Sequence, residues 1–195
     1  MANNQEIEVR AILTAAQRRT LPKKLRAGSK GGNRETRLSD IYYCPKKTGS
    51  FRQIEMQKPG SYSLRLRESR EGNKSRTSLN VKIITSRGDH NSWRELEIAV
   101  SSLAESEKIL AALGFKPFFR LEKTRRTFHM RGVTVAVEDI KNFGPVIEAE
   151  IITSRKRETA AKQKILNLLT DLEIKKEQIV KKSVTNLLMR KMSRF

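Results

Sequence analysis

The stretch QEIEVRAIL, residues 5–13, contains the pattern that decides the fold. Apolar Ile7, Val9 and Ala11 alternate with charged residues, so a strand over this stretch has one apolar face and one charged face. The charged residues are Glu6, Glu8 and Arg10. Near the other end of the chain, VIEAEI over residues 146–151 repeats the arrangement with two glutamates. Both stretches predict β-strands whose two faces differ in chemical character.

Several other predicted strands also carry charges of one sign on one face. They contribute Arg65 and Arg67, Lys82, Glu95 and Glu97, Lys123 and Arg125, and Glu148 and Glu150. Side chains two apart on a strand start about 6.6 Å from each other. At an effective dielectric of ~20, a like-charged pair at that separation costs about 2.5 kcal/mol. Water removes most of this cost on an open surface, where each pair taken alone is common. In a closed barrel the cost persists, and divalent metal for the carboxylates and a polyanion for the bases would offset it.

The order of the elements indicates an α+β protein that is mainly antiparallel β, with no alternating βαβ units. We predict strands at 5–13, 40–44, 51–57, 62–68, 78–85, 94–100, 118–128, 133–138 and 146–152, a helix at 14–25 and a mobile loop over 26–39. The capping box Ser102–Glu105 predicts a helix that ends at Gly114. Apolar stripes predict C-terminal helices within 154–190. We expect one domain, residues 1–195, with the barrel strands within 5–152.

The composition points to anionic ligands or partners. The chain has 195 residues, with 41 Lys and Arg against 21 Asp and Glu, a formal net charge of +20. Nucleic acid, nucleotides, polyphosphate and acidic surfaces therefore all remain candidates. One cysteine excludes an internal disulfide framework, and with only two histidines the chain cannot build a Cys/His structural zinc site. The absence of a long apolar run and of a signal peptide leads us to expect a cytoplasmic protein without membrane contact.

The charged strands follow an order that resembles the CYTH superfamily, which unites class IV adenylyl cyclases with thiamine triphosphatases. EIEVR at 6–10 is similar to the E-x-E-x-K signature of that family. The later matching segments are DIYYCP at 40–45, LRLRE at 64–68, NVK at 80–82, RELEI at 94–98, KTRRTF at 123–128 and VEDIKNFGPVIEAE at 137–150. The resemblance thus extends from Glu6 to Glu150, and the predicted C-terminal helical pair resembles the tail of class IV cyclase-like members.

The resemblance implies a closed eight-stranded antiparallel β-barrel, called a triphosphate tunnel, flanked by helices. Its interior would bind a triphosphate chain with basic side chains and hold Mg²⁺ or Mn²⁺ with acidic ones. Carried over by position, the metal-site acids would be Glu6, Glu8, Glu138, Glu148 and Glu150. The phosphate contacts would be Arg10, Arg65, Arg67, Lys82, Lys123 and Arg125. The catalytic group would be Glu6, Glu8 and Arg10, and the supporting acids would be Glu95 and Glu97.

One of these assignments is decided by strand parity. The family places a metal-site acid ahead of its last motif, where Glu138 and Asp139 are both candidates. Three valines at 133, 135 and 137 form an apolar face, so an unbroken strand puts Asp139 with the valines and Glu138 on the opposite face. The spacing from Glu138 to Glu148 also fits the cyclase-like members. We therefore predict Glu138 as the ligand, with Asp139 as the alternative.

These observations lead to a metal-dependent enzyme that acts on a triphosphate-bearing substrate, in the manner of class IV adenylyl cyclases: ATP to cyclic AMP and pyrophosphate. A triphosphatase that hydrolyses inorganic, thiamine or nucleoside triphosphate is an alternative, because the residues predict the phosphate grip but not which phosphorus is attacked. A non-catalytic polyphosphate- or RNA-binding module is another, since Arg10 and Glu138 replace the usual lysine and aspartate and most of the +20 charge must lie outside a tunnel. We expect a monomer or a homodimer.

Overall fold

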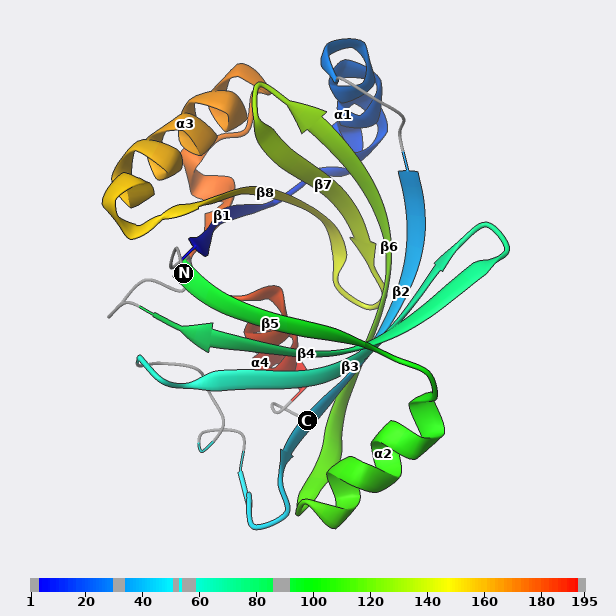
Figure 1. The fold of residues 1–195 in the computed structure, drawn as a ribbon. Helices are drawn as coiled ribbons and strands as arrows, with labels where there is room; N and C mark the ends of the chain where they lie inside the picture. The colour runs from blue at the N-terminus through cyan, green and yellow to red at the C-terminus, as the bar shows by residue number, and fades with distance from the viewer. Residues whose placement is uncertain (1–3, 30–33, 51–52, 54–58, 86–91, 193–195) are drawn as a thin grey trace.

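The computed structural model describes residues 4–29, 34–50, 53, 59–85 and 92–192, which form an antiparallel β-barrel with helices around it (Figure 1). The strands are β1 (Asn4–Ile12), β2 (Arg34–Pro45), β3 (Tyr62–Glu71), β4 (Lys74–Ile84), β5 (Ser92–Val100), β6 (Phe115–Met130), β7 (Val133–Ile140), β8 (Gly144–Ser154) and β9 (Ile179–Val180). The α-helices are α1 (Ala15–Gly28), α2 (Leu103–Ala112), α3 (Glu158–Asp171) and α4 (Val184–Met192). The 3₁₀ segments are η2 (Arg155–Arg157) and η3 (Lys176–Gln178).

The barrel closes because β1 pairs with strands on both of its edges. The sheet runs in the order β5-β4-β3-β2-β6-β7-β8-β1-β9, and β5 also pairs with β1 through Glu6–Trp93 and Ile7–Ser92. Further along β1, the edge that pairs with β5 pairs instead with the short strand β9, through Arg10–Val180. The expected closed barrel of eight antiparallel strands, β1 to β8, is thus confirmed, with β9 as an addition.

The main hydrophobic core lies on the outside of the barrel wall. The outward side chains of β1, β7 and β8 pack against α1 and α3, which cover one side of the barrel (Figure 1). Ile7 and Val9 of β1, for example, share this core with Ile165 of α3, and each is at most 2% exposed. Since alternation sends the apolar face of each strand outward to the helices, it sends the charged face inward.

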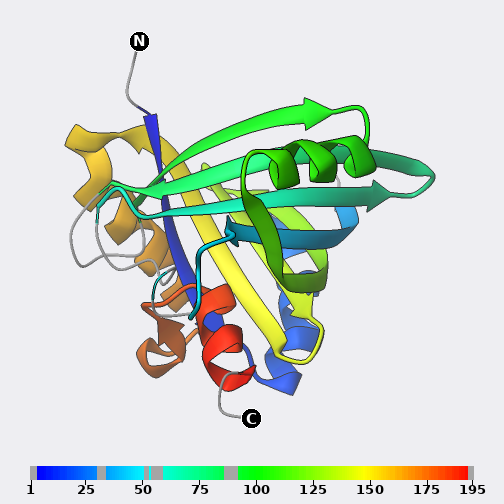
Figure 2. The ribbon, with the colours of Figure 1, turned by 90° about the horizontal axis from the view of Figure 1, so that it is seen from below.

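Two further clusters position α2 and α4. On the side of the barrel away from α3, Leu110 of α2 packs on Ile41 and Leu66. Helix α4 packs differently, because Val184 and Leu188 join a cluster with inward-facing residues of the barrel. Those inward residues are Tyr42, Phe119, Leu121, Ile140 and Val146. Helix α4, red in Figure 2, therefore covers one end of the barrel interior.

The structure corrects several expectations about the elements. β2 begins at Arg34, inside the segment expected to be a mobile loop, because its backbone pairs with β3 and β6. Ile179, expected in a helix, lies in β9. The Ser102 side chain caps α2 by accepting from the Glu105 N–H at 3.2 Å, but the Glu105 side chain binds Lys108 rather than completing a capping box. The strand expected at 51–57 falls outside the described residues, apart from Gln53. None of the helices in the described segments combines the length and apolar character needed to cross a membrane.

Candidate functional site

The barrel encloses a cavity of about 750 Å³ whose wall is largely charged. The basic residues that line it are Arg10, Arg65, Arg67, Lys82, Lys123 and Arg125. The acidic residues that line it are Glu6, Glu95, Glu97, Glu138, Glu148 and Glu150. Two further carboxylates, Glu8 and Asp40, belong to the same interior and are 1% and 0% exposed. All the charged residues that the sequence assigned to the tunnel therefore lie at this interior, whereas the alternative Asp139 lies outside it and pairs with Arg18 at 2.6 Å.

Most charges of the interior face an opposite charge on a neighbouring strand. Strand register places Asp40 opposite Arg67 and Lys82 opposite Glu95. It likewise places the Arg10 and Glu148 side chains opposite each other, with 2.6 Å between the Arg10 Nε and Glu148 Oε1 atoms. Directly opposed side chains have Cβ atoms about 4.5–5.5 Å apart, which suits an ion pair. The register of the barrel thus neutralises most of its buried charge locally.

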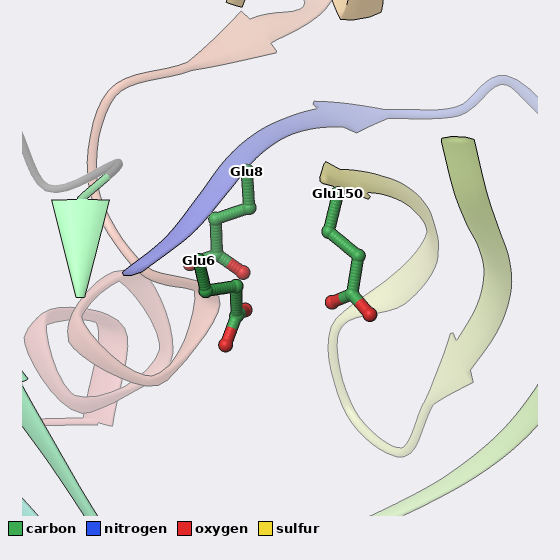
Figure 3. Close-up of side chains that lie close together, drawn as sticks. All are labelled: Glu6, Glu8 and Glu150. Carbon is green, nitrogen blue, oxygen red and sulfur yellow. The ribbon is translucent and has the colours of Figure 1, made fainter. Parts of the chain in front are cut away.

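Glu8 and Glu150 differ from these ion pairs, because register places the two carboxylates directly opposite each other. Glu6 lies two residues before Glu8, on the same face of β1, and its side chain joins the other two (Figure 3). Each of the three offers a carboxylate oxygen, and these oxygens all lie within 4.8 Å of one another. Like charges opposed across a sheet are destabilising, and more so when water is excluded. Three converging carboxylates fit a hard divalent cation such as Mg²⁺ or Mn²⁺, which takes oxygen ligands.

The pKa values of this cluster reflect burial and the repulsion between its carboxylates. Burial raises the pKa of Glu6 to about 9, and the carboxylates of Glu8 and Glu150 add to the rise while Lys82 opposes it. Burial also raises the pKa of Glu150, with Glu148 and Glu8 contributing. An ion of charge +2 at this position would favour the charged forms of these groups. The cluster is therefore the part of the tunnel wall that most favours a cation.

Two of the five predicted metal-site acids stand apart from this cluster. Glu138 accepts from Lys123 at 2.7 Å and from Arg125, while Glu148 accepts from Arg10 and Arg125. Although burial opposes its ionisation, these three bases hold the pKa of Glu148 well below its usual range. Burial lowers the pKa of Lys123. Glu138 opposes this decrease, but the positive neighbours Arg125 and Arg67 offset part of its effect. The structure thus brings three of the five predicted ligands together and places the other two outside this cluster.

Asp40 holds two of the predicted phosphate-binding arginines in place. Its carboxylate accepts two hydrogen bonds from Arg67, at 2.6 and 2.7 Å, and lies 3.6 Å from Arg65. Burial by itself would raise the pKa of Asp40, but the two guanidinium groups hold it well below its usual range. A bidentate Arg–carboxylate pair fixes the plane of the guanidinium. Asp40 therefore orients the basic wall.

Sequence reasoning did not assign a role to Asp40 or Asn80. Asn80 of β4 is 1% exposed and donates from its side-chain amide to Glu95 and to Glu97, at 3.3 Å for the latter. The available signal was parity, because Asp40 shares a strand face with Tyr42, and Asn80 shares one with Lys82. Glu95 also binds Lys82 at 3.2 Å, while Glu97 is exposed at the edge of the tunnel.

The arrangement joins a place for a divalent cation to a wall of bases within one cavity. Arg65, Arg67 and Lys82 belong to β3 and β4, whereas the acidic cluster belongs to β1 and β8. A long, linear polyanion could contact the bases on one side while cations bridge it to the acids on the other. Chemically, the site suits metal-assisted binding of a chain of phosphates.

Comparison with known proteins gives a consistent identity for the fold. The CYTH domain family matches residues 4–184. No curated protein sequence matches the chain. Among solved structures, a protein of Pyrococcus horikoshii OT3 is similar with a TM-score of 0.80 and 21% identity, over 95% of this chain and 99% of the other. At this identity the similarity establishes the fold.

Two similar structures have an activity in their descriptions. A candidate adenylate cyclase of Vibrio parahaemolyticus has a TM-score of 0.74 and 16% identity, covering 94% of this chain and 97% of its own. A candidate adenylyl cyclase of Hippeastrum, described as having a dominant triphosphatase activity, has a TM-score of 0.60 and 14% identity, covering 88% of each chain. The neighbours thus include both of the activities that the charged barrel itself could support.

Proposed function

The chain belongs to the CYTH domain family, and from this premise we propose that it is a metal-dependent enzyme acting on a triphosphate-bearing substrate, with a class IV adenylyl cyclase-like reaction as its first candidate activity. The observation that carries the proposal is the juxtaposition of an acid cluster and a basic wall in one cavity. Glu6, Glu8 and Glu150 converge on one side, and Arg65 and Arg67 line the other. Neither group alone would suit a metal–triphosphate complex.

In the free protein the acids and bases of the tunnel satisfy each other. Lys82 binds Glu6 at 2.8 Å, and Arg10 binds Glu8 and Glu148. A triphosphate without a cation would meet the carboxylates, and a cation without a phosphate would meet the bases. We therefore expect metal and triphosphate to bind together. The triphosphate would replace the carboxylates as the partner of the bases, and the metal would replace the bases as the partner of the carboxylates.

The acidic and the basic residues of the tunnel would have different roles in the reaction. Glu6, Glu8 and Glu150 would hold Mg²⁺ or Mn²⁺, which supplies charge neutralisation at phosphate oxygens and activation of the attacking oxygen. Arg65, Arg67, Lys123 and Arg125 would bind the phosphate chain and stabilise charge on the leaving group. Asp40 would keep two of these arginines oriented before the substrate arrives.

The two candidate reactions differ in which phosphorus is attacked. In cyclisation, the ribose 3′-hydroxyl attacks the α-phosphorus and pyrophosphate leaves. In hydrolysis, water attacks the terminal phosphorus and orthophosphate leaves. The triphosphatase reaction is the second candidate because a neighbour of the same fold, the Hippeastrum protein, is described as having it as its dominant activity. A non-catalytic polyphosphate- or RNA-binding module is the remaining alternative, motivated by the net charge of +20.

A product assay separates these candidates. We would incubate the purified protein with ATP, inorganic triphosphate or thiamine triphosphate, in Mg²⁺ or Mn²⁺, and identify the products. Cyclic AMP with pyrophosphate identifies a cyclase, and orthophosphate identifies a triphosphatase. Binding of these compounds without turnover, together with tight binding of longer polyphosphate or RNA, would support the module and contradict an enzyme.

The carboxylate Glu8 provides the control for the proposed site. Glu8→Gln removes one negative charge from the cluster, and we expect metal-dependent turnover to fall at least about a hundredfold while the fold persists. Glu35→Gln is the matched control, since Glu35 lies on the outside of β2 and pairs with Arg126. Wild-type turnover in Glu8→Gln, measured at saturating metal, would exclude the proposed metal site.

A further inference from the structure

One edge of β5 has no neighbouring strand along most of its length. Ser92 and Trp93, at the start of the strand, close the barrel by pairing with β1. From Arg94 to Val100, the described part of the chain provides a partner on one side only, and that partner is β4. Figure 2 shows β5 at the border of the sheet, with β4 beside it. The other edge therefore presents backbone N–H and C=O groups with which a further strand could pair.

The outer face of β5 beside this edge is apolar and exposed. Leu96 and Ile98 alternate with the inward glutamates and are 50% and 63% exposed. Register places Val81 of β4 beside Leu96 and Leu79 beside Ile98, so the apolar surface extends over both strands. Natural edge strands are usually protected by lysine, proline or a bulge. β5 contains no lysine and no proline, and it pairs with β4 without a shift in register.

The charge of this region differs from that of the whole chain. Residues 94–113, which include most of β5 and all of α2, contain four glutamates against one arginine and one lysine. The segment thus has a net charge of −2, whereas the whole chain has a formal net charge of +20. Two copies of so basic a protein repel each other, so they approach most easily through a face that is not basic. The region around β5 is such a face.

The side chains of β5 fit a second copy of the same strand in one register. In an antiparallel pair with twofold symmetry, the residue on the axis lies opposite itself in the partner. With the axis at Ile98, Leu96 lies opposite the partner's Val100, so aliphatic side chains meet on the outer face. On the inner face, Glu97 lies opposite the partner's Ala99. An axis at Glu97 or Leu96 would instead oppose two carboxylates directly, which is destabilising, and an axis beyond Ile98 would shorten the pairing.

We propose that the free edge of β5 pairs with the same edge of a second copy of this chain, in a symmetric dimer with Ile98 on the twofold axis. The pairing would continue the sheet from one barrel into the other and satisfy the backbone groups of both edges. It would also cover Leu96 and Ile98 of both copies, which are otherwise exposed. The inference goes beyond the proposed function and does not rest on it, because no ligand of the tunnel takes part.

The oligomeric state of the purified full chain gives the first test. Sedimentation equilibrium from micromolar to near-millimolar concentration should show a reversible monomer–dimer equilibrium. Ile98→Lys changes an exposed residue, so the fold should persist, but it places two ammonium groups opposite each other on the axis. We expect the affinity of the dimer to fall at least about a hundredfold. Ile152→Lys makes the same change at a residue of β8 that is 70% exposed, and it should alter the affinity by less than about twofold.

Cysteine variants test the register of the pairing. Directly opposed residues of an antiparallel pair have Cα atoms about 4.5–5.5 Å apart, which is within the range of about 4.4–6.8 Å that a disulfide spans. Ile98→Cys should therefore form a covalent dimer under mild oxidation, seen by non-reducing gel electrophoresis. Leu96→Cys should not, because the two copies of residue 96 would lie about 14 Å apart along the strands. Ile152→Cys measures cross-linking by chance collision, and the native Cys44 is buried.

Three results would each overturn the proposal. The first is a monomer over the whole concentration range, including one that binds an extended peptide of another protein along β5. The second is a dimer as stable in Ile98→Lys as in Ile152→Lys, with thermal unfolding used to show that both variants are folded. The third is cross-linking of Ile98→Cys no faster than that of Leu96→Cys or Ile152→Cys. None of these measurements needs a triphosphate, so their failure is separate from a failure of the proposed function.

Discussion

The two faces of β1 are equally buried and chemically opposite. On the outer face, Ile7 and Val9 are 1% and 2% exposed, and on the inner face Glu8 and Arg10 are 1% and 6% exposed. Burying an aliphatic side chain contributes about 1.5–3 kcal/mol to stability. Burying an ion pair often contributes nothing net, because desolvation offsets the attraction. One strand thus contributes to the stability of the fold through one face and carries buried, ion-paired charge on the other.

The tunnel and the rest of the molecule also differ in net charge. The tunnel contains two more carboxylates than basic groups, counting Glu8 and Asp40 together with the charged residues that line the cavity. The tunnel therefore contributes none of the formal net charge of +20. A simple anion-binding pocket would be expected to have an excess of bases. The excess of acids instead favours binding of an anion together with cations.

The largest effect on stability is expected at the outer core. Ile165→Ala removes a fully buried side chain of α3 that packs against β1 and the neighbouring strands. We expect the free energy of unfolding to fall by about 3–4 kcal/mol, from lost burial and the cavity left behind. Denaturant unfolding measures it, with Asn167→Ala on the exposed side of α3 as a control that should change stability by less than about 0.5 kcal/mol. Because the tunnel is untouched, turnover per folded molecule should stay within about twofold. A large loss of turnover per folded molecule would contradict the assignment of stability to the outer face and of activity to the inner face.

Neighbouring carboxylates of β7 test the inner face. Glu138→Gln removes the partner of Lys123 and Arg125, and we expect kcat/KM for the triphosphate substrate to fall about a hundredfold, or about 2.7 kcal/mol. Asp139→Asn, one residue along but outside the barrel, breaks only an exposed pair with Arg18 and should change kcat/KM less than twofold. Equal effects in the two variants would contradict the assignment of Glu138 by strand parity.

Asp40 gives the smallest of these effects and one that depends on pH. Since Arg65 and Arg67 hold its pKa below the ordinary 3.8 in the folded state, its charge stabilises the fold above about pH 4, and this contribution is lost as the pH falls through the folded-state pKa. We expect Asp40→Asn to lower the free energy of unfolding by about 2 kcal/mol at pH 7, and by progressively less below pH 4. Denaturant unfolding across this pH range measures the difference.

The exposed pair of Arg131 and Asp171 serves as the control for Asp40. Asp171→Asn breaks an ion pair whose side chains are more than half exposed, so stability should change by less than about 0.5 kcal/mol at any pH. If Asp40→Asn had the same small effect, or an effect independent of pH, Asp40 would not be the buried anchor of the two arginines.

Much of the fold was predictable because alternation is a local property. Glu138 and Asp139 occupy opposite sides of the wall, as the valines of β7 indicated. Arg131 and Gly132 form the β6–β7 turn, and both residues adopt the positive φ values, 51° and 71°, that a tight hairpin requires. The beginning of β2 was not predictable, since Gly, Ser and Arg before residue 39 signal a loop, and pairing with two neighbours overrides that preference.

The partners of the site residues could not be derived from the residues in the same way. Parity indicated that Asp40, Glu8 and Glu150 each share a face with charged or polar residues, but not which strand lies beside them. Glu8 and Glu150 are opposed only because β1 pairs with β8, 142 positions away in sequence at that point. Helix α4 reaches the tunnel because β9 attaches to β1 just before it. Such contacts depend on the closure of the barrel rather than on nearby residues.

The amino-acid order alone therefore determined which side chains share a face, which segments form strands, and that acids and bases would be sorted together. Only the tertiary structure decided that Glu6, Glu8 and Glu150 converge, that Asp40 binds two arginines, and that Asn186 reaches the same cavity. The physical reason is the separation in sequence over which each interaction acts. The period of a strand is set by neighbouring residues, whereas the meeting of two strands is set by the hydrophobic core outside the wall and by the backbone pairing that closes it.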